Sequence, residues 1–157
     1  MKINYILIPL AAFAVAGIGS LLTSSGMAWY KTIRLPAWTP DGSIIGTVWT
    51  ILFILAAISV LIVWNSSLGP EQAGRFKLIV AVFVINAVLN VGWSFLFFNQ
   101  HLLVSSVFEA GLLALSVIAL VILIWPVSRL AASLLIPYAA WVSFATYLTF
   151  SVWSLNR

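Results

Sequence analysis

Five long apolar runs constrain this chain more than any other feature of its sequence. They cover residues 5–27, 43–65, 78–99, 102–125 and 130–155. A helix needs about 20 apolar residues to cross the hydrocarbon core of a bilayer, and each run is long enough. Backbone groups in lipid must be hydrogen-bonded within the protein, which a helix achieves by itself. We therefore predict an all-α integral membrane bundle of five transmembrane helices, forming one domain over residues 1–157.

The composition excludes the other broad classes. Only 6% of the residues are charged and 64% are hydrophobic, whereas a soluble domain carries about 25% charged residues. Strands of a membrane barrel are about 10 residues long and alternate in polarity, and these runs do neither. The net charge of +4 results from seven Lys and Arg near the ends of the runs and three acids. Such cations anchor a protein in the bilayer, so we expect lipid and no nucleic acid as a partner.

Metal, disulfide and thiol chemistry have little support in this sequence. The chain has no cysteine and one histidine, His101. Disulfides and clusters of several Cys or His ligands are therefore excluded, and we expect no metal site. Nor do we find an acid pair, a phosphate-binding loop or a Ser-His-Asp set. Any catalysis would have to draw its reactivity from a bound ligand.

The first run allows two interpretations. Lys2, the apolar run and the small residues of AFAVAG (12–17) resemble a cleavable signal peptide. The run continues to Met27, which is too long for the apolar part of such a signal. We expect a retained span, and the absence of a recognisable organelle transit sequence favours a bacterial plasma membrane.

Three polar side chains inside the runs are candidates for function. Asn86 and Asn90 are four residues apart and share a helix face, which Trp93 and Phe97 continue. They either bond neighbouring helices or offer polar groups in an aromatic pocket, and both interpretations stay open. Glu109 is the one acid within a run. It either bonds another helix or serves a ligand or a proton relay.

The eight tryptophans divide by depth. Trp29, Trp38, Trp64, Trp125 and Trp153 lie near the ends of runs, where indole rings prefer the membrane interface. The deeper ones are Trp49, Trp93 and Trp141, in three different runs. Aromatic walls with a few polar groups form sites for flat apolar ligands, although plain core packing explains them as well.

Three blocks of sequence resemble the translocator protein family, whose bacterial members are the tryptophan-rich sensory proteins. The first is WYKTIRLPAWTPDGSIIGTVWTILF (29–53), the second NAVLNVGWSFLFF (86–98) and the third LIPYAAWVSFATYLTFSVWSLN (135–156). The blocks occur in the family's order, and the resemblance as a whole extends over nearly the whole chain. Two departures stand out. Asp41 replaces the second proline of the W-x-P-P pattern, and Tyr147 has no nearby Lys or Arg, so the cholesterol motif of animal members is absent.

The resemblance implies a five-helix bundle, usually a homodimer in bacteria, that binds tetrapyrroles such as protoporphyrin IX and benzodiazepine-type compounds as a receptor or sensor. No cofactor is required. Some bacterial members degrade porphyrin in light and oxygen, which gives Trp49 a possible catalytic role. The implied ligand-binding residues, with Asn86 added from its helix face, are Trp38, Trp49, Phe53, Asn86, Asn90, Trp93, Trp141 and Ala145.

The first connection would close this pocket. Its prolines restrict the backbone, Trp38 would cover the pocket mouth, and Lys31 and Arg34 would attract porphyrin carboxylates. The residues expected in this lid are Trp29, Tyr30, Lys31, Arg34, Pro36 and Pro40. Interfacial anchoring is the alternative role for the connection. The alternative function for the whole chain is a small transporter or exporter of apolar compounds that uses Glu109.

Overall fold

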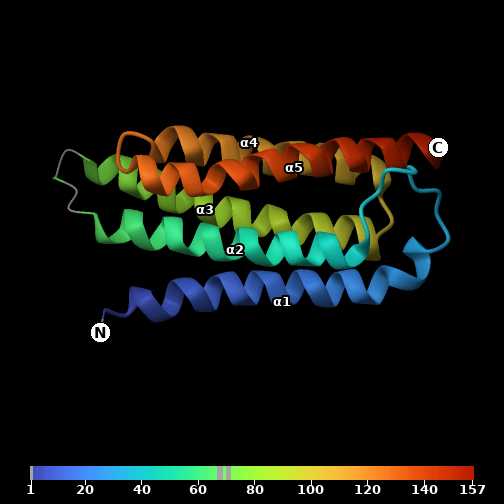
Figure 1. Cartoon of the computed structure of the whole chain (residues 1–157), viewed down its shortest axis with the longest axis horizontal. Coiled ribbons are helices and arrows are strands. Elements are labelled where there is room, and N and C mark those ends of the chain that lie inside the picture. The colour runs from blue at the N-terminus through green and yellow to red at the C-terminus, as the bar shows by residue number, and fades with distance from the viewer. Residues whose placement is uncertain (1, 67–68, 70–71) are drawn as a thin grey trace.

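The computed structural model describes residues 2–66, 69 and 72–157, and its regular elements are helices (Figure 1). Their number and apolar length confirm the predicted five-span membrane bundle. The helices are α1 (Asn4–Tyr30), α2 (Gly42–Asn65), α3 (Ala73–Ser94), α4 (Leu103–Ile124) and α5 (Arg129–Leu155), with a short π-helix, η2 (Phe95–Asn99), directly after α3.

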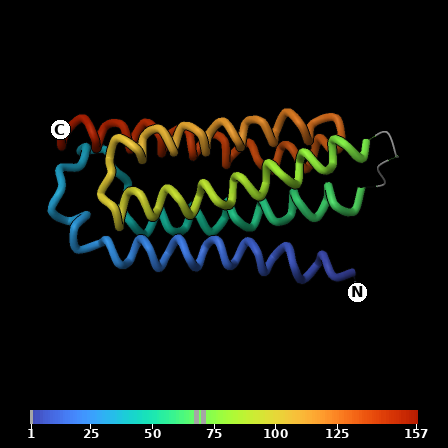
Figure 2. Tube along the Cα trace, turned by 180° about the vertical axis from the view of Figure 1, so that it is seen from behind, coloured from blue at the N-terminus to red at the C-terminus, as the bar shows by residue number. Residues whose placement is uncertain are grey.

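The helices form a closed ring of neighbours. Helix α1 packs against α2 and α3, α2 against α5, α5 against α4, and α4 against α3. Both views show long helices running side by side, with the N- and C-termini at opposite ends (Figures 1 and 2). The α1–α2 connection, the α3–α4 turn and the C-terminus share one end, so the first connection can reach the end of α5.

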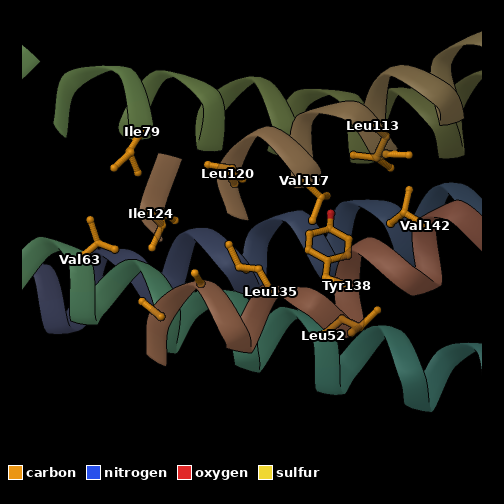
Figure 3. Packing of buried hydrophobic residues seen from close by; sticks show 13 residues of the cluster. Leu52, Val63, Ile79, Leu113, Val117, Leu120, Ile124, Leu135, Tyr138 and Val142 are labelled. Carbon is orange, nitrogen blue, oxygen red and sulfur yellow. The ribbon is translucent and has the colours of Figure 1, made fainter. Parts of the chain in front are cut away.

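Apolar side chains from α2, α3, α4 and α5 fill the interior (Figure 3). Val117, Leu120 and Leu135 are fully buried. Within this core a hydrogen bond joins α2 to α5, where the Ser59 hydroxyl donates to the carbonyl oxygen of Ala131 at 2.8 Å. In lipid, close packing and hydrogen bonds between helices take the place of the hydrophobic drive that assembles soluble proteins.

When η2 is counted with α3, two helix ends differ from the predicted spans by more than one residue. Helix α1 continues to Tyr30, three residues beyond 27, and α3 begins at Ala73 rather than at 78. The apolar runs mark the part of a helix that lies in hydrocarbon, but a helix can continue into the polar interface. Arg75 and Lys77 therefore lie in the first turns of α3, where long cationic side chains extend toward water.

The α3–α4 turn owes its tightness to two local features. The π-helix η2 ends the third span, and His101 then adopts a positive φ of 56°. Left-handed backbone of this kind reverses the chain within few residues. Next to the turn, α1 comes so close to η2 that a Cβ on Gly26 would lie 2.6 Å from the Cβ of Phe98. Only glycine permits that approach.

Candidate functional site

A buried hydrogen-bond network joins three helices at the middle of the bundle. The Tyr138 hydroxyl of α5 donates to Asn86 Oδ1 at 3.1 Å and accepts from Asn90 Nδ2 at 3.1 Å. Asn86 Nδ2 also donates to Ser116 Oγ of α4 at 2.8 Å. All four side chains are buried. The two asparagines share a face, as predicted, and their amides act as interhelical hydrogen-bonding groups.

Trp49 extends this network into an aromatic wall. Its ring stacks on Phe53, one turn along α2, with centroids 5.6 Å apart. It also meets the edge of Tyr138, with centroids 6.0 Å apart and planes at 76°. Figure 3 shows Tyr138 projecting from α5 into the packed interior near Val117. The tyrosine therefore connects the aromatic residues of α2 to the amides of α3.

An apolar groove runs between α2 and α5 on the membrane-facing surface. Its volume is about 370 Å³, and its lining residues are Val48, Ile51, Leu52, Pro137, Ala140, Trp141 and Phe144. Ile51 and Ala140 are exposed, so the groove opens toward lipid, while buried Leu52 forms part of its floor. The indole Nε1 of Trp141 is buried and has no hydrogen-bond partner among the described residues.

The first connection places Trp38 against α5 at the edge of this groove. Its ring stacks on Tyr147 with centroids 5.5 Å apart and planes at 11°. It also meets the edge of the groove residue Phe144 at 5.9 Å. A turn holds Trp38 there, because both the backbone N–H and the hydroxyl of Thr39 donate to the carbonyl oxygen of Pro36, at 3.0 and 2.7 Å.

Asn156 fastens the same connection to the end of α5. The Arg34 backbone N–H donates to Asn156 Oδ1 at 2.9 Å, and Asn156 Nδ2 donates back to the Arg34 carbonyl oxygen at 2.8 Å. Asn156 Nδ2 also lies 2.7 Å from the Val152 carbonyl oxygen. The Asn156 side-chain amide thus makes two reciprocal hydrogen bonds with the backbone N–H and carbonyl oxygen of Arg34, the pattern that a neighbouring β-strand would provide. We call this pair the clasp.

A second aromatic cluster gathers where α1 meets η2. Trp93 stacks on Phe97 with centroids 5.0 Å apart. Trp29 stacks on the His101 ring at 4.0 Å, and Tyr30 packs on Phe98 at 5.5 Å. These rings pack the end of α1 against η2, at the end of the bundle that carries the α1–α2 connection (Figure 1).

The structure therefore divides the predicted site residues into groups. Tyr138 links Trp49, Phe53, Asn86 and Asn90, while Trp38 and Trp141 meet at Phe144. Ala145 is half-buried one turn beyond Trp141. Trp93 belongs to the second aromatic cluster.

The predicted lid residues also fall into two groups. Trp29 and Tyr30 are the last residues of α1, and their part in a lid stays a prediction. Lys31 and Arg34 are exposed in the connection, and Pro36 and Pro40 are half-buried there.

Several residues of this site were not among the predicted ones, and Tyr138 and Asn156 are the two with the most hydrogen bonds between distant segments. Tyr138 carries a hydroxyl inside a span, and a buried tyrosine normally finds a partner. Because Tyr138 shares a helix face with Trp141, this need for a hydrogen-bond partner could have identified Tyr138 as a site residue from the sequence. Asn156 lies after the last span, and no local pattern identifies Arg34 as its partner.

Comparison with known proteins agrees with this architecture. The sequence model of the TspO/MBR family matches residues 5–154. A tryptophan-rich protein TspO of Bacillus cereus is 31% identical over 156 residues, covering 99% of each chain. The uncharacterized membrane protein YtaB of Bacillus subtilis is 37% identical over 147 residues, covering 93% of this chain and 90% of its own. The human translocator protein is 29% identical over 132 residues, 84% of this chain and 77% of its own.

The five apolar helices and the bacterial relatives support a multi-pass protein of a bacterial plasma membrane. The family match extends over almost all of the bundle, including the network, the groove and the first connection. This chain is a member of the TspO/MBR family of integral membrane proteins.

Proposed function

We propose that the protein is a membrane receptor or sensor that binds a flat aromatic ligand, with tetrapyrroles such as protoporphyrin IX as the representative class. The observation that carries this proposal is the placement of Trp38 beside the α2–α5 groove. A tryptophan from a loop lies at 5.9 Å from Phe144, which itself lines the groove. A loop side chain in that position can cover or release a ligand.

The shape and chemistry of the groove support a planar apolar ligand. Its volume of about 370 Å³ lies within the range of small-molecule sites. In the sequence of α2, Trp49 lies between two residues that line the groove, Val48 and Leu52, and its ring packs on Phe53 and Tyr138. Under this proposal Trp49 forms the inner wall of the occupied site. A groove of this size takes part of a macrocycle and leaves charged substituents outside.

The end of the bundle next to the groove suits the carboxylates of a porphyrin. Lys31 and Arg34 are exposed in the connection that carries Trp38. Cations near the membrane surface pair readily with carboxylates. The apolar macrocycle would then lie in the groove, with its acidic side chains toward these two residues.

A titration of purified protein in detergent tests the proposal. Protoporphyrin IX is added in the dark while tryptophan fluorescence is followed, for wild type, Trp49→Leu and Trp38→Ala. Trp64→Phe is the matched control, because Trp64 lies at the other end of α2 and packs on Phe76. We expect saturable quenching in wild type. Each aromatic contact is worth about 0.5–1.5 kcal/mol, so each of the two variants should weaken binding about 2- to 12-fold.

The outcome decides between three cases. Quenching that does not saturate in wild type contradicts the proposal. Saturation with an unchanged porphyrin absorption band under light supports a receptor or sensor. Loss of the band under light, reduced in Trp49→Leu, supports the additional photochemical role for Trp49.

A second candidate function is supported by one observation. Glu109 is 8% exposed, and neither of its carboxyl oxygens has a hydrogen-bond partner in the described part of the chain. Acids inside membrane helices commonly mark transport pathways. We propose the export of an apolar cation coupled to Glu109 as the alternative. In proteoliposomes, Glu109→Gln should abolish such transport while leaving porphyrin affinity nearly intact.

A further inference from the structure

The start of α1 and the end of α2 lie at the same end of the bundle, away from the first connection (Figure 1). A cavity of about 350 Å³ lies between them, and its lining residues include Lys2, Asn4, Leu7, Trp64 and Asn65. None of these residues lines the α2–α5 groove. The cavity is therefore a separate feature of the bundle, and its occupant does not depend on the proposed function.

Asn4 brings an unused hydrogen-bond donor to this cavity. Its side chain is 5% exposed, and its Nδ2 has no hydrogen-bond partner among the described residues. By contrast, Asn86 and Asn90 donate from Nδ2 to other helices at 2.8 and 3.1 Å. A buried donor without a partner costs free energy. Because Asn4 lines the cavity, an acceptor oxygen bound there would supply the missing partner.

The start of α1 adds further groups that favour an acceptor. The helix has no side-chain cap at Ile3 and no acidic residue in its first turn. Free N–H groups and the helix dipole make such an N-terminus attractive to anions. Lys2 is exposed, lines the cavity and adds a positive charge. The α1 side of the cavity is therefore suited to an anionic oxygen ligand.

The α2 side of the cavity offers less to a cation. Three carbonyl oxygens of the last turn of α2 already accept hydrogen bonds from the residues that end the helix. Asn65 Nδ2 donates to the carbonyl oxygen of Leu61 at 2.8 Å. The Ser66 hydroxyl donates to that of Ile62 at 2.8 Å, and the Ser66 N–H to that of Val63 at 3.2 Å. These acceptors are occupied, while the donor of Asn4 is not.

The charges at this end of the bundle also favour an anion. Four of the seven cations of the chain lie at the starts of helices here: Lys2, Arg75, Lys77 and Arg129. Asp41 precedes α2 and Glu109 lies in the second turn of α4, so both acids belong to the opposite end. The third acid of the sequence, Glu71, lies outside the described residues.

The position of the cavity selects a lipid as the source of the anion. It lies where the first span begins and the second ends, the depth at which a bilayer presents its phosphate groups. Leu7 gives its wall an apolar part below Lys2 and Asn4. Basic residues at this depth attract anionic lipids. We propose that the cavity binds the phosphate group of an anionic phospholipid, with the Asn4 amide and the Lys2 ammonium as its contacts.

Thermal unfolding of the purified protein in nonionic detergent tests this site. Dioleoylphosphatidylglycerol, dioleoylphosphatidylcholine and inorganic phosphate are titrated separately, and the rise of the midpoint with concentration gives an apparent affinity for each. In wild type the anionic lipid should bind about fivefold more tightly than phosphatidylcholine, the factor that one lysine near a membrane surface provides. Inorganic phosphate should give no shift at the concentrations at which the lipid saturates.

Two variants separate the two contacts. Lys2→Gln should remove the preference for phosphatidylglycerol and keep the binding of phosphatidylcholine. Asn4→Leu, which is similar in size, should weaken both lipids about tenfold, because each loses a hydrogen bond to its charged phosphate. Asn4→Leu should not lower the midpoint without lipid, because it removes a donor that has no partner. Lys77→Gln is the matched control, an exposed cation at the same end that does not line the cavity, and should keep the wild-type preference.

Four results would overturn the proposal. The first is equal affinity of wild type for the two lipids, which requires no variant to fold. The second is an equal loss of preference in Lys77→Gln and Lys2→Gln, which would indicate diffuse attraction to this end of the bundle. The third is a shift by inorganic phosphate equal to that by the lipid, which would indicate a site for a soluble anion. The fourth is an Asn4→Leu variant with a lower midpoint and unchanged lipid affinity, which would give Asn4 a packing role only.

Discussion

The clasp between Asn156 and Arg34 gives the sharpest prediction about the first connection. Asn156→Ala removes the two hydrogen bonds that reach the Arg34 backbone, at 2.9 and 2.8 Å. A hydrogen bond contributes about 0.5–1.5 kcal/mol net, and this pair is exposed, so we expect a loss near 1–2 kcal/mol. Because 1.36 kcal/mol is tenfold, local opening of the loop should become about 5- to 30-fold more frequent.

Amide hydrogen exchange measures that opening directly. In wild type the Arg34 N–H is bonded to Asn156, so its exchange requires the clasp to open. In Asn156→Ala the exchange of Arg34 should accelerate by the factor above, and the amides of residues 35 and 37–39 should follow. Amides in the middle of α4 should not change, because the hydrogen bonds of Asn156 in the described structure go to Arg34 and Val152 and not to that helix.

Asn156→Asp refines the experiment. Aspartate keeps an oxygen that accepts from the Arg34 N–H but loses the donor to the Arg34 carbonyl oxygen. An acceleration between those of wild type and alanine is expected. The reasoning is refuted if Arg34 exchanges at the wild-type rate in Asn156→Ala. Equal acceleration in every helix would show that Asn156 supports the whole bundle instead.

Two further predictions concern the packing of the bundle. Tyr138→Phe leaves Asn86 and Asn90 without their shared partner, which should cost about 1–3 kcal/mol of stability. Thermal unfolding in detergent should therefore show a lower midpoint than wild type, whereas Tyr147→Phe, at an exposed position, should leave the midpoint unchanged. A wild-type midpoint for Tyr138→Phe would contradict the importance of the network. Gly26→Leu inserts a side chain where even a Cβ would lie 2.6 Å from Phe98 Cβ. A forced shift of this kind typically costs about 1–3 kcal/mol of stability. The thermal midpoint of this variant should fall well below that of the control Gly17→Leu, because nothing lies within 4 Å of a Cβ at Gly17.

The sequence predicted the secondary structure correctly in the segments that the bilayer forces to be helical. Lipid satisfies no backbone hydrogen bond, so every long apolar run must be helical, and the five spans follow from length alone. The same argument does not fix helix ends in the polar interface. That is why α1 runs on to Tyr30 and α3 begins at Ala73.

The tertiary structure decided which side chains meet. These helices are apolar on all sides, so no amphipathic stripe tells which face turns inward. The sequence placed Asn86 and Asn90 on one face, yet it could not identify Tyr138 as their common partner across 48 and 52 positions. It placed Trp93 and Phe97 on that same face, and the structure stacks these two rings. A common pocket for Trp93 and Trp49 stays a prediction.

The same limit applies to the loop. The two prolines of the first connection predict a segment with restricted backbone freedom, because proline fixes φ and lacks an N–H. Its resting place depends on Asn156, a residue 122 positions from Arg34. Local chemistry and the solvent thus determine the elements of this protein, while contacts between distant residues determine where its candidate binding surfaces lie.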